Sequence, residues 1–279
     1  MSKTILITGS STGIGKAGAL ELGRRGWKVF VHARSTERGI PVLDELKQNA
    51  PNADFSLVTG DVSSIEQVKS LAKQVKEQTN TLDVLWNNAG LTLNERQVSV
   101  DGWEMTMAIN HLAPFVLTRE LLPLIEPVQG RVITTSSGAY AFGSFNWDDW
   151  MNEKSTYNSF KAYSNSKLAN ILFTRELARR VNAQAVTVHC FHPGLVSTDF
   201  GKPREEEKQK SYIPGPLVRS LFMIDAKAGA DTGVFLAEDP SARNINGNFW
   251  FKRKVRKTNR FVNDVNAAKL WELSEKATS

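Results

Sequence analysis

The chain has 279 residues, of which 41% are hydrophobic, a net charge of +6 and a sequence pI of about 9.4. This is ordinary for a protein with a substantial core, and no linker or composition shift marks a boundary, so we expect one domain over residues 1–279. The basic residues form no single block, so the charge fits an anionic ligand and does not predict nucleic acid as a partner. The densest basic run, Lys252–Arg260, is either a solvated edge or a patch in weak peripheral contact with phospholipid.

The single cysteine, Cys190, lies in an apolar run and is interpreted as a buried strand residue. One cysteine excludes an intramolecular disulfide and favours a reducing compartment. No stretch approaches the roughly 18 apolar residues of a membrane span, and no signal peptide precedes the first predicted strand. The sequence therefore predicts a soluble, cytoplasmic protein.

A glycine-rich loop follows the first predicted strand, Lys3–Thr8, and leads into a predicted helix. It contains Gly9, Gly13 and Gly15. Glycine suits such a loop because the turn needs unusual backbone angles and because a missing side chain lets a pyrophosphate approach the amides of the helix N-terminus. The pattern favours dinucleotide binding over a tight turn that binds no ligand.

The second predicted strand, Trp27–Ala33, ends at Arg34, and Arg38 follows at the start of a predicted helix, Glu37–Asn49. In this architecture an acidic residue after the second strand binds the ribose 2′-hydroxyl of NAD(H), whereas a basic residue accommodates the 2′-phosphate of NADP(H). The arginine predicts NADP(H). The alternative is a pair of exposed arginines at the start of a solvated helix.

The third predicted strand, Phe55–Val58, is followed by Asp61–Val62. From the residues alone, Asp61 is either a local cap or an adenine contact. Ser63 and Glu66 have the spacing of a capping box and predict a helix that ends near Gln78.

The fourth predicted strand, Leu82–Trp86, ends in the NNAG sequence of Asn87–Gly90. Asparagine and glycine tolerate turn geometry, yet this position is a strand's carboxyl end, where open α/β sheets bind ligands. A long predicted helix then begins with Asp101 as N-cap and Glu104 three residues later. Within it, Asn110 is expected to be buried and needs hydrogen-bond partners, as a structural bridge or as a relay.

The fifth predicted strand, Arg131–Thr135, ends in Ser136 and Ser137 and is followed by an insert rich in aromatic and turn residues. Its aromatic side chains either line an apolar ligand site or pack the insert onto the core, and the residues leave both readings open: Phe142, Phe145, Trp147 and Trp150.

Two tyrosine–lysine pairs with i, i+4 spacing come next, Tyr157 with Lys161 and Tyr163 with Lys167. Residues at this spacing share a helix face, and an ammonium beside a phenol favours the phenolate, so either pair could exchange a proton near neutral pH. Only the second pair leads directly into an apolar-periodic helix. The spacing alone leaves the choice between the two pairs open; this context favours Tyr163, in which case Tyr157 is a helix-entry or pocket-wall residue.

The rest of the chain continues the alternation of strands and helices. A strand at Ala185–Phe191 precedes the HPG sequence, and His189 and His192 have no ligand set nearby that would complete a metal site. A charged, proline-rich segment at about 197–220 is expected to be a flap over the substrate. The last predicted elements are a helix at Asp225–Glu238, a strand at Gly247–Phe251 and a helix at Asn263–Lys276. The alternation predicts an α/β fold with a doubly wound, seven-stranded parallel sheet of the Rossmann type.

Six motifs together carry a resemblance to a known family. They are TGSSTGIG at Thr8–Gly15, NNAG at Asn87–Gly90, Asn110 in the long helix, SS at Ser136–Ser137, YSNSK at Tyr163–Lys167 and HPGLVST at His192–Thr198. In this order and over nearly the whole chain, they resemble the short-chain dehydrogenase/reductase family, whose members move a hydride between NAD(P)(H) and a carbonyl or alcohol substrate.

Within that family the chain is most similar to the retinol dehydrogenase branch, which includes relatives that act on varied carbonyl compounds. The similarity rests on ARS at Ala33–Ser35, INHL at Ile109–Leu112, SKLANILFTREL at Ser166–Leu177 and AAKLWELS at Ala267–Ser274. Animal enzymes of this branch usually carry an N-terminal hydrophobic anchor, whereas the first predicted strand begins here at once.

The resemblance implies catalytic roles for four residues. Tyr163 would be the general acid/base, and Lys167 would lower the pKa of its phenol and hold the nicotinamide ribose. Ser137 would orient the carbonyl, and Asn110 would support a water that links Lys167 to solvent. The resemblance also implies a cofactor site formed by Gly9, Ser11, Thr12, Gly13, Ile14, Gly15, Arg34, Arg38, Asp61, Val62, Asn88, Ala89, Gly90, Tyr163, Lys167, Pro193, Val196 and Thr198.

The leading expectation is thus an NADP-dependent oxidoreductase acting on an apolar aldehyde, ketone or alcohol, with retinal among the candidates and with no metal. An alternative is a dinucleotide-sensing protein of the same fold that binds without turnover. Light-driven protochlorophyllide reduction is disfavoured, because those relatives use cysteines for the pigment pocket and this chain has only Cys190. The family often pairs through its two long helices, so a homo-oligomer is an open expectation.

Overall fold

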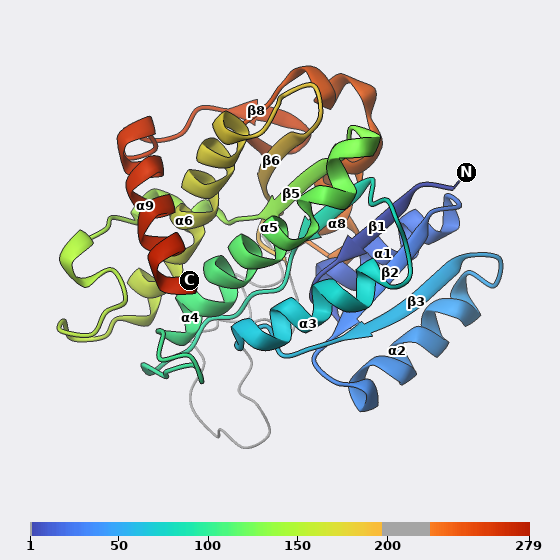
Figure 1. Ribbon diagram of the computed structural model, residues 1–279, viewed down its shortest axis with the longest axis horizontal. Helices are drawn as coiled ribbons and strands as arrows, with labels where there is room; N and C mark the ends of the chain where they lie inside the picture. The colour runs from blue at the N-terminus through green and yellow to red at the C-terminus, as the bar shows by residue number, and fades with distance from the viewer. Residues whose placement is uncertain (1, 197–223) are drawn as a thin grey trace.

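The computed structural model describes residues 2–196 and 224–279, and within them the strands form one eight-stranded sheet in the order β3-β2-β1-β4-β5-β6-β7-β8 (Figure 1). Neighbouring strands are parallel, except that β8 is antiparallel to β7. The order reverses between β1 and β4, as the predicted doubly wound fold requires. The strands are β1 (Thr4–Ile7), β2 (Lys28–Ala33), β3 (Asp54–Thr59), β4 (Val84–Asn87), β5 (Arg131–Thr135), β6 (Thr187–His192), β7 (Asn248–Phe251) and β8 (Lys254–Arg256).

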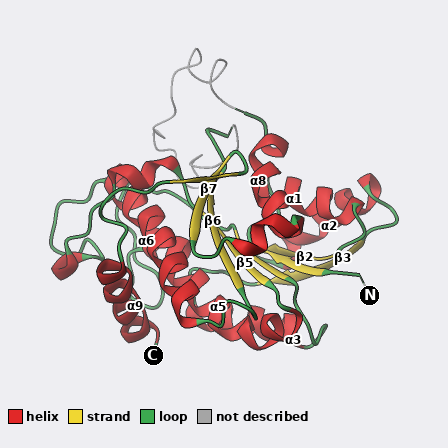
Figure 2. Ribbon diagram, turned by 90° about the horizontal axis from the view of Figure 1, so that it is seen from above, coloured by secondary structure: helices red, strands yellow, loops and turns green. Residues whose placement is uncertain are grey.

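Helices cover both faces of the sheet, so that it lies between two helical layers (Figure 2). One layer contains α1 (Gly13–Arg24), α2 (Thr36–Asn49) and α8 (Ala226–Glu238). The other contains α3 (Ile65–Lys76), α5 (Ala113–Ile125) and α6 (Ser159–Arg180), with α9 (Asp264–Thr278) packed on α6. Shorter segments are α4 (Met105–Met107), the π-helix η1 (Ala108–Leu112) and the 3₁₀ turns η2 (Glu126–Val128), η3 (Gly138–Phe142), η4 (Trp147–Asp149) and η5 (Pro240–Asn244). Among the helices of the described residues, none is long and apolar enough to cross a membrane.

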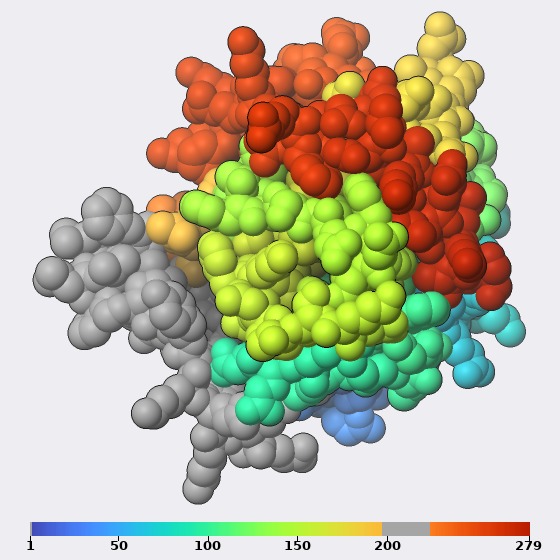
Figure 3. Space-filling view, turned by 90° about the vertical axis from the view of Figure 1, so that its left-hand side faces the viewer, coloured from blue at the N-terminus to red at the C-terminus, as the bar shows by residue number. Residues whose placement is uncertain are grey.

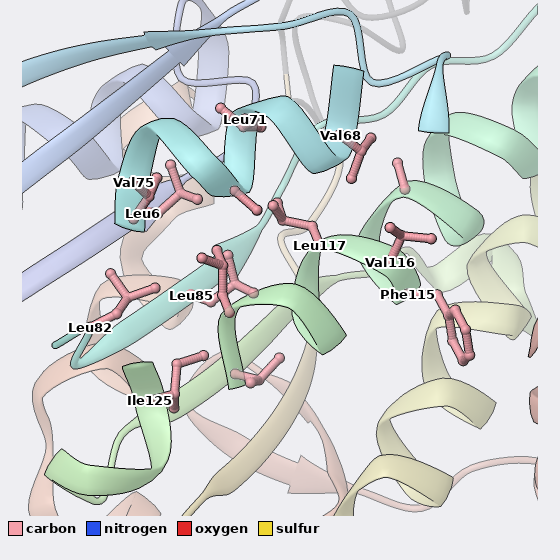
Figure 4. Close-up of a cluster of buried hydrophobic side chains, with 14 of the residues drawn as sticks. Leu6, Val68, Leu71, Val75, Leu82, Leu85, Phe115, Val116, Leu117 and Ile125 are labelled. Carbon is pink, nitrogen blue, oxygen red and sulfur yellow. The ribbon is translucent and has the colours of Figure 1, made fainter. Parts of the chain in front are cut away.

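Side chains along the central strands point alternately to the two faces of the sheet, so the core consists of two layers. In β1, Ile5 and Ile7 pack toward α1 and α8, whereas Leu6 points to the opposite face. Figure 4 shows Leu6 among side chains of α3, β4 and α5, including Leu85 and Leu117. Because both faces are buried, the strands are continuous apolar runs, which made them recognisable in the sequence.

The eighth strand, β8, was not predicted. Lys252 and Arg253 have positive φ angles of 52° and 58° and form the tight turn that folds β8 back onto β7. All three residues of β8 are exposed. A short, charged edge strand has no apolar alternation, so the sequence pattern gave no strand signal here.

The residues predicted to cap two helices at their N-termini are wrong. Helix α3 is capped by the Ser64 side chain and not by Ser63. The long helix begins after Glu104, whose carboxylate accepts hydrogen bonds from two backbone amides of the first turn at 2.9 and 2.7 Å. Asp101, the predicted cap, instead accepts a hydrogen bond from the backbone N–H of Ile65 at 2.9 Å. Both true caps lie within a few residues of the predicted ones, where several polar side chains compete for the same amides.

The aromatic insert after β5 packs mainly onto the core. Phe145 and Trp147 stack at 4.8 Å between ring centroids, and both lie within 6.2 Å of Phe261. Trp150 packs against the same cluster, whereas Phe142 is 70% exposed. Figure 3 shows the insert between the C-terminal segment and the segment near residues 91–104. Three of the four aromatic residues thus take the packing role that the sequence left open.

Buried histidines make the fold sensitive to acid. Burial lowers the pKa of His32, lowers those of His111 and His189 to about 3, and lowers that of His192 to about 4. Below pH 6.5, the ordinary histidine pKa, the folded protein therefore binds fewer protons than the unfolded chain. The neutral histidines contribute their full stabilisation of the fold above pH 6.5, and this contribution decreases as the pH falls. Each such histidine should lower the free energy of unfolding by about 1.4 kcal/mol for every pH unit below 6.5, as long as its imidazole stays neutral in the folded protein.

We therefore expect urea denaturation to give a free energy of unfolding several kcal/mol lower at pH 5.5 than at pH 7.5, about 1.4 kcal/mol from each of His111, His189 and His192. A His189→Leu variant should show a smaller loss, because one of the neutral histidines is gone. Equal stability at the two pH values would contradict this account.

Candidate active site

The glycine loop between β1 and α1 follows a path that side chains would block. Gly9 has a φ of 62°, and a Cβ there would lie 2.8 Å from the Cα of Ala89. A Cβ on Gly15 would lie 2.5 Å from the carbonyl oxygen of Gly9 and 2.6 Å from Nδ2 of Asn88. Gly13, with a φ of 55°, begins α1. The predicted strand–loop–helix arrangement is present.

The N-terminus of α1 has the character of an anion site. Thr12 is the N-cap residue, but its side chain makes no hydrogen bond to the helix, and the first turn contains no acidic residue. The amides and the positive end of the helix dipole are therefore not neutralised by a cap. Ser11 lies in the loop just before α1, and Ile14 packs partly into the core beneath it.

Contacts within the protein hold the ends of β1 and β4 together. The backbone N–H groups of Asn88 and Ala89 both donate to Oγ1 of Thr8, at 2.9 and 3.0 Å, and the Asn88 side chain donates to the Thr8 carbonyl at 3.0 Å. These donors are therefore engaged in positioning the loop. A bound cofactor would meet the carbonyl groups and the van der Waals surface of Asn88 and Ala89 rather than their amides.

His32 supports the loop from β2, and sequence reasoning missed it. Its Nδ1 accepts a hydrogen bond from the Gly9 N–H at 2.9 Å, and its Nε2 donates to the Gly60 carbonyl at 2.9 Å. Burial keeps this imidazole neutral by lowering its pKa. In the sequence His32 is an isolated polar residue in an apolar strand, and that interruption was the one available signal.

The ends of β2 and β3 bring Arg34 and Asp61 together. The Arg34 Nε atom lies 3.6 Å from Oδ2 of Asp61. The other Asp61 oxygen accepts a hydrogen bond from the Ser63 N–H at 2.9 Å, so Asp61 also caps its own turn. Arg38 is exposed in the first turn of α2, and Val62 packs partly against the core. An arginine and a carboxylate thus lie side by side at the carboxyl edge of the sheet.

Tyr163, Ser137 and Lys167 gather at the carboxyl end of β5. The Ser137 hydroxyl lies near enough to the Tyr163 phenol to favour its ionised form. The Lys167 ammonium lies 5.6 Å from the centroid of the Tyr163 ring and donates to the Thr135 carbonyl at 3.2 Å. The structure therefore brings together three of the four predicted catalytic residues.

The pKa of the Tyr163 phenol differs from the expectation. Burial raises it to about 12, and the nearby Ser137 hydroxyl only partly opposes this rise. The Lys167 ammonium donates to the β5 carbonyl of Thr135, 5.6 Å from the centroid of the Tyr163 ring. Burial lowers the pKa of Lys167 to about 8, which still leaves the ammonium mostly charged at pH 7. At neutral pH the protein therefore presents a protonated phenol near a lysine cation.

Asn110, the fourth predicted residue, bridges two parts of the site. It is fully buried in the π-helix η1, and its side chain forms two hydrogen bonds with the backbone of Leu91, at 2.8 and 2.9 Å. It also donates to Oγ of Ser166 at 2.9 Å. A Cβ on Gly90 would lie 3.1 Å from Oδ1 of Asn110 and 3.3 Å from Nζ of Lys167. Asn110 therefore has the structural bridging role, and its relay role stays a prediction.

Three supporting residues were not singled out by the sequence. Ser166 donates to the Tyr163 carbonyl, Ser136 donates to the Lys167 carbonyl, and Asn170 donates to the Thr135 carbonyl. The bonds of Ser136 and Asn170 attach α6 to the end of β5, whereas that of Ser166 lies within α6. Serine and asparagine within a helix often make such backbone contacts, but their spacing alone does not identify the partner.

The segment after β6 lies beside the glycine loop. A Cβ on Gly229 of α8 would lie 2.8 Å from Val196 and 3.2 Å from Ile14, so these two predicted cofactor residues converge. Pro193 precedes Val196 in the same segment. Thr198 and the predicted flap at 197–220 lie outside the described residues. No group of three or more metal-ligating side chains occurs within residues 2–196 and 224–279.

Comparisons with known proteins agree with this arrangement. The profile of the short chain dehydrogenase family matches residues 3–209. Human retinol dehydrogenase 14 is 36% identical over 98% of this chain and 85% of its own length. A crystal structure of a protein from Mycobacterium paratuberculosis is 30% identical, with a TM-score of 0.78 over 99% of this chain and 93% of that one.

A more distant structure shows the same fold. It is the alcohol dehydrogenase of the archaeon Thermococcus sibiricus complexed with 5-hydroxy-NADP, which is 22% identical, with a TM-score of 0.69 over 93% of this chain and 100% of that one.

Proposed function

The chain belongs to the short-chain dehydrogenase/reductase family, and from this premise we propose that it is an NADP-dependent carbonyl reductase or alcohol dehydrogenase acting on an apolar substrate. Because the chain belongs to this family and is similar to its retinol dehydrogenase branch, it is an NAD(P)-dependent oxidoreductase. The choice of NADP, the substrate and the residue roles are our proposals. The observation that carries them is the placing of Tyr163 and Ser137 beside Lys167, at the carboxyl edge of the sheet.

The glycine loop fits a dinucleotide. Its backbone passes where a Cβ on Gly9 or Gly15 would strike neighbouring backbone or side-chain atoms, and it leads to a helix N-terminus without a cap. A pyrophosphate can approach such a loop closely, and the helix end favours its negative charge. When bound, NADP(H) supplies the hydride that moves between carbon 4 of the nicotinamide and the substrate carbon.

The proposed roles of the protein residues follow from their positions. The protonated Tyr163 hydroxyl donates its proton to the carbonyl oxygen as that oxygen gains negative charge. The Ser137 hydroxyl, which lies near Tyr163, orients the same oxygen. Lys167 holds the nicotinamide ribose and supplies positive charge. Asn110 fixes the backbone next to the water that would link Lys167 to solvent. At neutral pH the Tyr163 phenol is protonated, so it holds a proton that it can give to the carbonyl oxygen.

Arg34 supports the choice of NADP. It stands at the end of β2, where the ribose of the adenosine is bound in this architecture, and its guanidinium can pair with a 2′-phosphate. Asp61, 3.6 Å from Arg34 Nε, holds the guanidinium at this edge and lies where the adenine is expected. Several solved structures of the same fold contain NADP, which is consistent with this proposal.

An Arg34→Asp variant is expected to shift preference from NADPH toward NADH by at least about tenfold, or about 1.4 kcal/mol, because two carboxylates would then face the 2′-phosphate. Steady-state kcat/KM with each cofactor measures this shift. Lys69→Asp makes the same charge change on the exposed face of α3 and should leave the ratio unchanged. An unchanged ratio in Arg34→Asp would contradict the 2′-phosphate role.

Two exposed aromatic side chains support an apolar substrate. Phe142 is 70% exposed in η3, just after Ser137, and Phe160 is 54% exposed on α6, one turn before Tyr163. Their ring centroids are 5.5 Å apart. Apolar surface next to a reactive group favours a ligand that buries it.

The rival function is a dinucleotide sensor that binds without turnover. A screen of NADPH oxidation over aldehydes, ketones and retinal separates the two functions. We expect turnover with at least one apolar carbonyl compound, because the site keeps a complete set of acid, orienting group and cation. Tight NADPH binding with no turnover of any carbonyl would instead favour the sensor.

A further inference from the structure

His111 is a buried polar residue with no role in the proposed chemistry. It follows Asn110 directly in the π-helix η1, and its Nε2 atom lies 2.8 Å from Oγ of Ser274 in the C-terminal helix α9. The Ser274 hydroxyl donates its own proton to the Leu270 carbonyl at 2.7 Å, so its oxygen accepts from the His111 Nε2–H group. Burial lowers the pKa of His111 to about 3, which keeps the ring neutral at pH 7. A buried hydrogen bond therefore joins η1 to α9.

The His111 ring is also packed against two phenylalanine rings. It lies edge-on to Phe173 of α6, at 6.1 Å between centroids, and is tilted against Phe115 of α5 at 6.3 Å. Trp271 of α9 packs against both phenylalanine rings. Among the described residues, the Nδ1 atom of His111 has no hydrogen-bond partner, so the bond to Ser274 is the one that its ring makes there.

Asn110 holds the same π-helix from another direction. Its side chain forms hydrogen bonds with the Leu91 backbone at 2.8 and 2.9 Å, and donates to Oγ of Ser166 in α6 at 2.9 Å. Neighbouring side chains of a helix point roughly 100° apart. The π-helix is therefore held through Asn110 by α6 and the loop after β4, and through His111 by α9.

The unusual geometry of η1 makes such contacts necessary. The Ala113 N–H donates to the Ala108 carbonyl, five residues back instead of the four of an α-helix. Turns of this kind are rare and occur mostly as single bulges within α-helices, so contacts outside the helix must favour them over the regular form. A return to α-helical spacing would rotate the side chains on one side of the bulge by about 100°. Such a rotation would take Asn110 away from Leu91 and Ser166.

We propose that His111 and Ser274 are positioning residues, whose hydrogen bond fixes the π-helix that places Asn110 against its partners. A Cβ on Gly90 would lie 3.1 Å from Oδ1 of Asn110 and 3.3 Å from Nζ of Lys167, so these two side chains lie against the same glycine. A displaced Asn110 would change the surroundings of the Lys167 ammonium. The helix α9 is in this way part of the support of the active site. The expected effect on turnover rests on the proposed function, whereas the expected effect on the position of Asn110 does not.

Ser274→Ala removes the acceptor of the His111 N–H group and leaves the aromatic rings unchanged. The buried donor is then unpaired, which a shift of the ring and of η1 can relieve. We expect kcat to fall by about ten- to a hundredfold, as when a remote change displaces an active-site group by about 1 Å. The dissociation constant for NADPH should change little, because the glycine loop is unaltered.

Two further comparisons control for a general loss of stability. The Thr278 hydroxyl donates to the Ser274 carbonyl at 2.8 Å, a contact of the same kind one turn later in α9, so Thr278→Ala is the matched control and should keep the wild-type kcat. His111→Gln can place an amide N–H near the position of Nε2. It should therefore retain most of the kcat that His111→Leu loses.

Amide hydrogen exchange measures the position of Asn110 independently of turnover. The Leu91 N–H is bonded to Oδ1 of Asn110, so its exchange in Ser274→Ala should be about tenfold faster, the factor that the loss of one hydrogen bond represents. The exchange of a core amide, such as that of Ile133 in β5, should rise less. A merely structural role of Ser274 predicts instead that exchange rises at Ile133 as much as at Leu91.

Unchanged exchange at Leu91 in Ser274→Ala, or an equal loss of kcat in Thr278→Ala, would overturn the inference and leave the proposed function intact. A wild-type protein that binds NADPH but reduces no carbonyl compound would contradict the proposed function. The exchange at Leu91 would still decide whether α9 positions Asn110, so the two failures are distinguishable.

Discussion

A Tyr163→Phe variant is expected to lose turnover by about a hundred- to ten-thousand-fold, the usual contribution of a positioned general acid. Phenylalanine fills nearly the same space but cannot give a proton to the carbonyl oxygen. NADPH binding, measured by fluorescence titration, should change little, because the glycine loop and Arg34 are unaltered. Retained turnover in this variant would contradict the role assigned to Tyr163.

Tyr157→Phe is the matched control, since Tyr157 and Lys161 have the same spacing as Tyr163 and Lys167. The Tyr157 hydroxyl lies 3.1 Å from Oε1 of Glu104, to which it donates, and takes no part in the site around β5. Its removal should cost about 1.5–3 kcal/mol of stability, as for one buried hydrogen bond to a carboxylate, with near-normal turnover. A loss of turnover as large as that of Tyr163→Phe would contradict the choice of Tyr163 over Tyr157 as the general acid.

Gly15→Ala is expected to weaken NADPH binding by about ten- to a hundredfold. Helix propensity alone would favour alanine at this position of α1 by about 1 kcal/mol. The new Cβ, however, would lie 2.5 Å from the Gly9 carbonyl oxygen and 2.6 Å from Nδ2 of Asn88. Relieving this overlap moves the loop that must cradle the pyrophosphate, and overpacking of this kind costs roughly 1–3 kcal/mol. Isothermal titration calorimetry with NADPH measures the change.

Gly26→Ala provides the control for Gly15→Ala. Gly26 has a φ of 82°, but no atom lies within 4 Å of the position that its Cβ would take. This variant should lose stability from backbone strain and keep its affinity for NADPH. If Gly15→Ala bound NADPH as tightly as the wild-type protein, the loop would not be the pyrophosphate site.

Much of the architecture could be predicted because the strands are apolar on both faces. β1 with its glycine loop, β4 with the following NNAG and β5 with the two serines were each identified by an apolar run that ends in polar or small residues. In a parallel sheet these ends meet at one edge. The sequence could therefore predict that Ser137 and the glycine loop would lie on the same side of the molecule, and the structure confirms it.

Other features depend on contacts that no local pattern reveals. Glu104 rather than Asp101 caps the long helix, because the chain turns between the two residues and directs Asp101 to α3. The pKa of Tyr163 is raised by burial, and the Lys167 ammonium is bonded to the Thr135 carbonyl. The support of Gly9 by His32 joins residues 23 positions apart. Each of these results follows from tertiary packing, and spacing along the chain does not determine it.

Hydride transfer itself is the central claim, and isotope labelling tests it most directly. The wild-type protein would be incubated with NADPH carrying deuterium at carbon 4 of the nicotinamide, using each diastereomer in turn, and with a carbonyl compound that the screen identifies. We predict that one diastereomer delivers deuterium to the carbonyl carbon of the product, as seen by mass spectrometry, and that Tyr163→Phe nearly abolishes this transfer. Oxidation of NADPH without deuterium in the product would contradict the account.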